Sequence, residues 1–454
     1  MLRNAICAVL SLSLRIFFRR IEIAGKERVP KDKPVIFVLN HPNGLVDPVF
    51  LLCLSGRPVS FLAKEPLFRM PLIGSLVRSL DALPVYRQQD QGADTSRNTE
   101  TFVAARKLLS RGGALAICPE GVSHDEPRLK PIKSGAARIA LGAASTGRNL
   151  DLQIVPAGLY YTSKMTFRSS ALLFFGDPLP VEPVPLEKNG EPARAAVAAL
   201  SEKIETALRE VMLHAEHEEG LTAVERAERI FSAELPGEDE ENSLSRELEL
   251  RKLFLNSYAV WQERDPIRLE TLDHRLRRYE EQLSRLTLEP DEFERPVSTF
   301  TTAVKLALPA LAFIALTPFA MVGLLLHYPA YRLTGFLAKR LARDADDIVS
   351  TIKIIASMLF FPLTWVIVSF GLYLISGWKV GLVALLLVPL FGYLAIRFFE
   401  ELDQFIGGVR SLTFYLTRRR YFLRLLAERK AIFDEMLKMG EEPGQVGSVT
   451  GEEA

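Results

Sequence analysis

VIFVLNHPNGLVDP, residues 35–48, is the most informative stretch of the chain for its fold class. Five apolar residues end at Asn40 and His41, a turn with Gly44 follows, and Asp47 stands directly before Pro48. Asp is favoured as a helix cap and Pro in the first helical turn, so the stretch predicts strand, turn and helix. A carboxylate at the helix start can orient an imidazole at the strand end, as a general base requires. The alternative is an ordinary helix cap beside a loop histidine.

Similar apolar runs continue the pattern outward from this stretch. They lie at 59–62, 82–85, 114–118, 152–157 and 171–175, and helix-like segments occupy 48–54, 97–111 and 132–146. Alternating strands and helices favour an α/β fold with a central sheet flanked by helices. We therefore predict an α/β domain over residues 30–192.

Charged and polar residues follow several of the predicted strands. The segment 118–123 (CPEGVS) begins at the last residue of the run 114–118. Lys64 and Arg87 each stand at the end of another run. Lys133 precedes a helix that begins at Ser134 and Gly135. Cations beside a helix start make a plausible phosphate site, although each one alone is more commonly a solvated surface charge.

The overall composition excludes several classes of protein. The 454 residues carry 56 Lys and Arg against 55 Asp and Glu, which argues against a nucleic-acid partner. The three cysteines lie far apart and form neither a disulfide framework nor a zinc spacing, so we expect a reducing compartment. No second histidine lies at metal-ligand spacing from His124, and we expect no metal site.

Three long segments contain no charged residue, at 306–326, 354–375 and 380–396. A helix needs about 20 apolar residues to cross a bilayer, so residues 301–400 predict an integral membrane protein. Basic residues concentrate at 327–353 and after 396. Both basic segments lie on the cytoplasmic side if 306–326 is re-entrant, turning at Thr317-Pro318, while the other two segments form a spanning hairpin. The α/β domain then faces the cytoplasm.

The remaining segments are expected to be helical. Residues 1–22 predict an interfacial helix, because apolar residues recur at helical spacing and arginines flank them. The alternative is a helix packed on the protein's own body. Residues 193–300 predict a charged helical segment with paired amphipathic helices. Residues 401–454 predict a cytoplasmic helical tail with a disordered end.

Five sequence blocks occur in an order that resembles the phospholipid/glycerol acyltransferase family. They cover residues 34–165: His41 to Asp47, KEPLF at 64–68, PVYR at 84–87, PEG at 119–121 and IVPAG at 154–158. The resemblance implies transfer of a fatty acyl group from acyl-CoA or acyl carrier protein to a hydroxyl of a glycerophosphate. It also implies membrane lipids as surroundings and no resident cofactor.

Residue by residue, the resemblance implies a division of labour in the site. His41 matches the general base and Asp47 its orienting partner, while Arg87 matches the arginine that binds the acceptor phosphate. Glu120 and Gly121 match the block at the phosphate end of the pocket. Basic positions near that end match Lys64 and Lys133, and the same loop adds Ser123 to the substrate-binding set.

The chain departs from the commoner family pattern at two places. Five residues separate His41 from Asp47 where four are usual, and Val122 and Ser123 stand where Thr and Arg are usual. With these two departures, the pattern of the chain is similar to that of the branch containing fungal glycerol-3-phosphate/dihydroxyacetone-phosphate acyltransferases. No Gly-x-Ser-x-Gly motif is present, so we expect direct attack on the thioester. The alternatives are a lysophosphatidate acyltransferase, an acyl-thioester hydrolase and a non-catalytic lipid-binding membrane protein.

Overall fold

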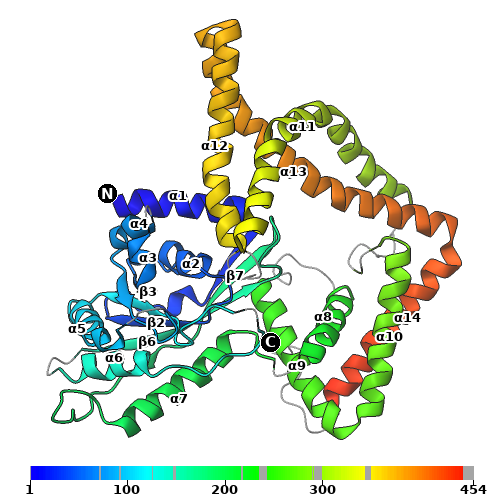
Figure 1. Cartoon of the computed structure of the whole chain (residues 1–454). Coiled ribbons are helices and arrows are strands. Elements are labelled where there is room, and N and C mark those ends of the chain that lie inside the picture. The colour runs from blue at the N-terminus through cyan, green and yellow to red at the C-terminus, as the bar shows by residue number, and fades with distance from the viewer. Residues whose placement is uncertain are drawn as a thin grey trace. The chain divides into compact units, whose positions relative to one another are not determined.

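The computed structural model describes residues 2–70, 73–90, 94–124, 126–146, 150–215, 218–234, 243–288, 290, 299–342 and 349–442 (Figure 1). The chain forms two compact units. The α/β unit comprises Met1–Glu216, Ser243–Leu248 and Leu337–Ile355, and the helical unit comprises His217–Asn242, Glu249–Phe336 and Ala356–Ala454.

A mixed sheet forms the centre of the α/β unit, which confirms the predicted fold class. Its strands lie in the order β1-β7-β6-β2-β5-β3-β4, and β8 pairs with β6. Parallel pairing joins β6, β2, β5, β3 and β4, whereas β7 runs antiparallel to β6. The strands are β1 Arg20–Ala24, β2 Val35–Leu39, β3 Ser60–Lys64, β4 Leu83–Val85, β5 Ala114–Ile117, β6 Gln153–Tyr161, β7 Ser170–Phe175 and β8 Leu179–Pro180.

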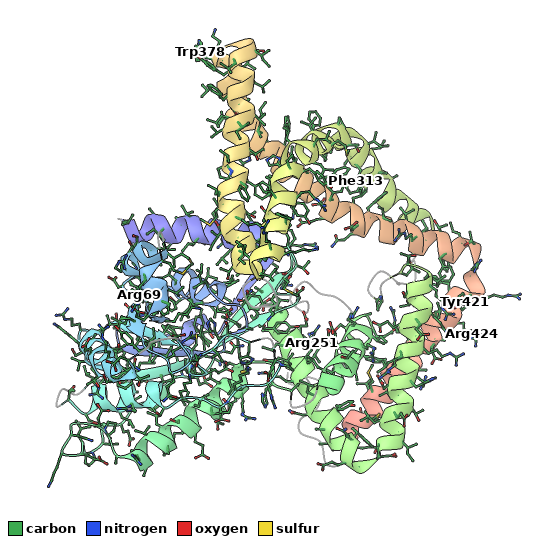
Figure 2. All side chains as sticks on the ribbon, viewed as in Figure 1. Arg69, Arg251, Phe313, Trp378, Tyr421 and Arg424 are labelled. Atoms are coloured by element: carbon green, nitrogen blue, oxygen red, sulfur yellow. The ribbon has the colours of Figure 1, made fainter. Side chains whose placement is uncertain are left out.

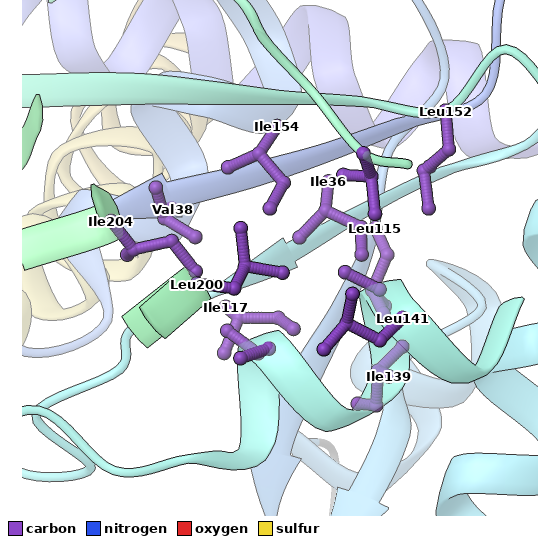
Figure 3. Close-up of a cluster of buried hydrophobic side chains, with 14 of the residues drawn as sticks. Ile36, Val38, Leu115, Ile117, Ile139, Leu141, Leu152, Ile154, Leu200 and Ile204 are labelled. Carbon is purple, nitrogen blue, oxygen red and sulfur yellow. The ribbon is translucent and has the colours of Figure 1, made fainter. Parts of the chain in front are cut away.

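Side chains of β2 alternate between two apolar cores, as a strand buried on both faces requires. Ile36 and Val38 join one cluster with side chains from β5, β6, α6 (Gly135–Ala144) and α7 (Arg194–Val211) (Figure 3). Phe37 points to the other face, where its ring lies 5.9 Å from that of Phe175. Helices α2 (Val46–Leu54) and α5 (Asn98–Leu109) follow β2 and β4 in the chain, and α3 (Pro66–Arg69), α4 (Ile73–Ser79) and the 3-10 turns η1 (Lys26–Arg28) and η2 (Thr95–Arg97) complete the unit.

The α/β unit extends beyond the boundaries that the sequence predicted. Strand β1 lies before residue 30 and pairs with β7, and α7 lies beyond residue 192 yet packs into the core. Gly158 allows this packing, because a Cβ there would stand 1.7 Å from the Val211 carbonyl oxygen. Helix α7 is rich in charged residues, so its role in the core was not predicted. Its buried apolar stripe consists of Val197, Leu200, Ile204, Leu208 and Val211.

Helix α1 (Leu2–Phe17) has two apolar faces. Leu14 and Phe17 are buried, and α1 packs against α2, where the Cys53 thiol donates to the Cys7 carbonyl. The exposed face carries Leu2, Val9, Leu12 and Ile16. Packing on the protein's own body therefore accounts for one face, and the interfacial role remains a prediction for the other.

The helical unit has its own core. Helices α8 (Glu218–Ser232), α9 (Leu244–Arg264), α10 (Pro266–Arg285) and α14 (Arg419–Glu441) surround it. Trp261, Leu272, Leu276, Tyr279 and Leu283 are buried there. These buried positions agree with the predicted pairing of amphipathic helices.

Three helices among the described residues are long and apolar enough to cross a membrane: α11 (Thr299–Ala342), α12 (Val349–Ser376) and α13 (Trp378–Thr417). Many of their apolar side chains are exposed, as Trp378 illustrates (Figure 2). Such surfaces need lipid around them, so the protein associates with a membrane. Where α11 meets α13, a Cβ at Gly323 would stand 2.0 Å from the Phe391 carbonyl oxygen, which is the close approach that small residues permit.

The turn expected at Thr317-Pro318 is absent from the structure. Residues on both sides of Pro318 remain in α11, which contains Pro309, Pro318 and Pro329 and bends along its length (Figure 1). Each proline removes one backbone donor, and this bends a helix without ending it when neighbouring bonds persist. The turn between α12 and α13 does lie within the expected 376–379, at Gly377 with a φ of 85°. The end of the predicted tail, 443–454, lies outside the described residues.

Candidate active site

The imidazole of His41 and the carboxylate of Asp47 are hydrogen-bonded, with 2.9 Å between Nδ1 and Oδ2. Asp47 is completely buried, whereas 19% of the His41 side chain is exposed. The extra loop residue is accommodated because Gly44 adopts a φ of 41° and α2 begins at Val46. Asp47 therefore lies inside the first helical turn rather than at the cap position expected from the sequence.

The contact with Asp47 sets the chemistry of the His41 ring. The Asp47 carboxylate accepts a hydrogen bond from Nδ1–H, so the neutral ring carries its hydrogen on Nδ1 and presents the lone pair of Nε2. When Nε2 takes a proton, the nearby negative charge stabilises the imidazolium. The arrangement is that of a general base with its orienting carboxylate.

Two further donors hold Asp47. The backbone N–H of Asn43 donates to Oδ2 at 2.7 Å, and the hydroxyl of Tyr161 donates to Oδ1 at 2.6 Å. Burial raises the pKa of Tyr161 well above its usual value, and the Asp47 charge raises it further, so the phenol stays protonated. Tyr161 was not predicted as a site residue, because the apolar run in the sequence ends at 157, whereas β6 continues to 161.

Asn40 fixes the position of the histidine at the sheet edge. Its side-chain amide donates to the Leu159 carbonyl at 3.0 Å, and its side-chain oxygen accepts from the Leu159 N–H at 2.7 Å. The side chain thus continues the β2–β6 ladder one step beyond Leu39. Sequence reasoning noted Asn40 only as part of the block, because its partner lies 119 residues away.

A second histidine–carboxylate pair lies next to the first. Glu120, which is 3% exposed, accepts through Oε2 from the ring of His124 and from the Lys130 N–H at 2.8 Å. The His124 N–H in turn donates to the His41 carbonyl at 3.2 Å. Among the described residues, Glu120 Oε1 and His124 Nδ1 are buried without a hydrogen-bond partner. Buried polar atoms without partners mark a place where a ligand hydroxyl would be favourable.

Cations gather at the other end of the same edge. The Arg87 guanidinium makes two bonds to Asp90, at 3.0 Å from Nε and 2.6 Å from Nη2, and donates through Nη1 to the Gly121 carbonyl at 2.9 Å. The bond from Arg87 lowers the pKa of Asp90, and the charges of Lys64 and Lys133 lower it further. The structure thus brings the predicted cations around one carboxylate that the sequence analysis did not single out.

Gly121 lies directly against this cluster. It has a φ of 72°, and a Cβ there would stand 2.6 Å from Lys133 Nζ. Lys64 and Lys133 are both exposed, as a group that meets a soluble phosphate should be. Ser123, from the same loop, is half-buried between Gly121 and His124.

The strand order places these groups in a fixed sequence along the edge. His41 follows β2, Glu120 follows β5, Lys64 ends β3 and Arg87 follows β4. Adjacent strands lie about 4.8 Å apart, so the ends of β2 and β4 are separated by roughly 14 Å. His41 and the cations therefore lie at separate points along one edge of the sheet.

The thiol of Cys118 is near enough to Asp47 and Glu120 to be affected by both charges. Burial raises the pKa of its thiol well above the usual value, and the charges of Asp47 and Glu120 raise it further. A thiol that stays protonated is a poor nucleophile. This environment favours a packing role for Cys118.

Family models match both parts of the chain. Residues 20–160 match the model described as Acyltransferase, and residues 232–444 match the Glycerol-3-phosphate acyltransferase 2 C-terminal domain. The first match covers the strands and turns that carry the site, and the second covers most of the helical unit.

Named relatives extend these matches. An uncharacterised acyltransferase of Schizosaccharomyces pombe is 25% identical, over 89% of this chain and 75% of that protein. Glycerol-3-phosphate O-acyltransferase 1 of Saccharomyces cerevisiae is 26% identical over 77% of this chain, which spans 58% of that protein. A chloroplastic 1-acyl-sn-glycerol-3-phosphate acyltransferase of Brassica napus is 30% identical, over 37% of this chain and 46% of that protein.

Matches on both halves of the chain agree on the class: an acyltransferase domain is followed by a segment similar to the C-terminal domain of an acyltransferase. The chain is similar to the phospholipid/glycerol acyltransferase family, and its relatives include glycerol-3-phosphate acyltransferases.

Proposed function

We propose that the protein transfers a fatty acyl group from acyl-CoA or acyl carrier protein to a hydroxyl of glycerol-3-phosphate or a related glycerophosphate. The observation that carries this proposal is the pairing of His41 with buried Asp47 on the sheet edge that also bears Lys64, Arg87 and Lys133. A base alone would serve hydrolysis equally well. The neighbouring cations favour an acceptor that carries an anionic group.

The reaction follows from the positions of these groups. His41 Nε2 takes the proton of the acceptor hydroxyl, and the oxygen attacks the thioester carbonyl to form a tetrahedral intermediate. The C–S bond then breaks, the ester forms, and the leaving thiolate takes the proton from the His41 imidazolium. Asp47, which accepts hydrogen bonds from the Asn43 N–H and the Tyr161 hydroxyl, stabilises that imidazolium through its negative charge.

The cations contribute by fixing the acceptor. An acceptor phosphate held near Arg87 and Lys133 places its hydroxyl toward the base, which makes the attack effectively intramolecular. Glu120 Oε1 is available to accept a hydrogen bond from another acceptor hydroxyl. Arg87 already pairs with Asp90, so the phosphate binds to the cluster as a whole rather than to an isolated arginine.

Glycerol-3-phosphate is the acceptor that the matches favour. The Saccharomyces cerevisiae relative named for it aligns over 77% of this chain, whereas the Brassica napus relative named for 1-acylglycerol-3-phosphate aligns over 37%. The match to the second family model adds the helical unit to this likeness. Lysophosphatidate, which presents the same phosphate, is the second candidate.

We place the α/β unit on the cytoplasmic side of the membrane. Basic residues lie at the ends of two membrane helices: Lys339 and Arg340 are in the last turn of α11, and Arg418 and Arg419 follow α13. Positively charged flanks are retained on the cytoplasmic side. Labelling of a cysteine at position 340 only after cells are permeabilised supports this orientation, and labelling from outside intact cells contradicts it.

A product assay tests the function. The full chain, purified into lipid nanodiscs, is given labelled acyl-CoA or acyl carrier protein with glycerol-3-phosphate, dihydroxyacetone phosphate or lysophosphatidate. We expect an acylated product from glycerol-3-phosphate. Free fatty acid alone would identify a hydrolase, phosphatidate alone would identify the second candidate, and no turnover would leave a lipid-binding protein.

A further inference from the structure

The first turn of α12 contacts the loop that joins His41 to Asp47. The Leu45 N–H donates to the hydroxyl of Thr351 at 3.2 Å. Thr351 is 7% exposed, and it belongs to the α/β unit although the rest of α12 continues into the helical unit. A residue 306 positions away thus contacts the catalytic loop directly.

The same turn of α12 reaches the loop by a second route. The Lys164 ammonium donates to the Pro42 carbonyl at 2.9 Å, and the Lys164 carbonyl accepts from the hydroxyl of Ser350. Lys353 donates to the next carbonyl, that of Met165, at 2.6 Å. Both ends of the turn between His41 and Asp47 are therefore held from outside.

The loop needs such support because of its length and its place in the fold. Leu45 is the N-cap residue of α2, and no side-chain cap bonds there. The first N–H groups of a helix lack intrahelical partners, so Leu45 depends on another element for one. The loop also holds one residue more than the commoner spacing. An additional residue with Gly44 in the left-handed region gives the turn more conformations to adopt unless it is braced.

We propose that Thr351 and Lys164 are positioning residues for acyl transfer, holding the turn that sets the geometry between His41 and Asp47. This inference rests on the proposed function of His41. A displacement of about 1 Å at a reacting group can lower a rate by about 10²-fold, so a loosened turn lowers kcat while the acceptor site at Arg87 is unchanged.

Thr351→Val tests the proposal, because valine keeps the shape and removes the hydroxyl. The full chain in nanodiscs should show kcat lowered about tenfold, with the acceptor KM unchanged within about twofold. Thr351→Ser should restore most of the rate. Thr364→Val is the matched control, since the Thr364 hydroxyl bonds only to the Phe360 carbonyl within the same helix, at 2.9 Å.

A second variant distinguishes positioning from a general loss of stability. Lys164→Met should lower kcat similarly, and the double variant should lose less than the product of the two single effects, because both act on one loop. Wild-type kcat in Thr351→Val with active wild-type enzyme would overturn the inference and leave the function standing. Equal losses in Thr351→Val and Thr364→Val, or no rescue by serine, would also overturn it. A wild-type chain without acyl transfer would instead refute the proposed function.

Discussion

The hydroxyl of Tyr161 donates a 2.6 Å hydrogen bond to Asp47 Oδ1, on the opposite side of the carboxylate from His41. The ring of Tyr161 is fixed by Phe18 and Phe50, whose centroids lie 5.6 and 5.8 Å away. Because α2 carries Asp47 and β6 carries Tyr161, this bond ties the catalytic turn to the sheet. Tyr161 therefore holds in place the Asp47 carboxylate that bonds to His41.

Tyr161→Phe should lower kcat without changing the acceptor KM. Hydrogen bonds to charged groups contribute about 1.5–3 kcal/mol, which corresponds to a loss of about 10–150-fold if the whole effect reaches the transition state. Steady-state kinetics on the full chain measure it. Tyr160→Phe is the control, because the neighbouring hydroxyl bonds to Glu247 at 2.7 Å. Unchanged kcat in Tyr161→Phe would contradict a role for Tyr161 in holding Asp47 for catalysis.

Arg87→Met should raise the acceptor KM at least about tenfold, because it removes the guanidinium from the cation cluster. The KM for acyl-CoA should change little. The comparison is with Arg69→Met, a 75%-exposed arginine paired with Glu65 and labelled in Figure 2. If both variants changed the acceptor KM equally, the effect would be one of overall charge, and the phosphate site would have to lie elsewhere.

Alkylation of the cysteines has a pH dependence that the structure specifies. Burial, with a contribution from Cys7, raises the pKa of Cys53 to about 12, and the pKa of Cys118 is raised well above its usual value. A raised pKa keeps the thiol protonated until the pH passes that value, so at pH 8 only about one Cys53 in 10⁴ is a thiolate. We expect iodoacetamide at pH 8 to leave Cys53 and Cys118 unmodified in the native protein.

The denatured protein is the control for this measurement, since both cysteines should react there, as peptide mass spectrometry would detect. Cys118→Ser should keep acyl transfer near the wild-type rate. Rapid modification of native Cys118 together with loss of activity would contradict direct attack and favour a covalent acyl-enzyme.

Local sequence patterns correctly predicted which candidate residues lie at the ends of strands. The strand-ending positions of His41, Glu120, Lys64 and Arg87 followed from apolar runs and their breaks, since parallel strands bring their carboxyl ends to one edge. The sheet in the structure brings these residues to that edge in the order of its strands. Their roles in catalysis remain predictions.

The partners of these residues did not follow from the sequence. Tyr161 lies 114 residues from Asp47, and Thr351 lies 306 residues from Leu45. Such pairs leave no periodic or spacing signal, and only the three-dimensional fold brings them together. The same reason explains why α7 looked like part of a charged helical segment until its apolar stripe was placed on the sheet.

The rate of acyl transfer by His41→Ala, in full-length protein that remains in the membrane, tests the central claim most directly. The account predicts that kcat falls by on the order of 10²–10⁴, the usual contribution of a general base, while membrane association is unchanged. A variant within about tenfold of the wild-type rate would contradict the assignment of His41 as that base.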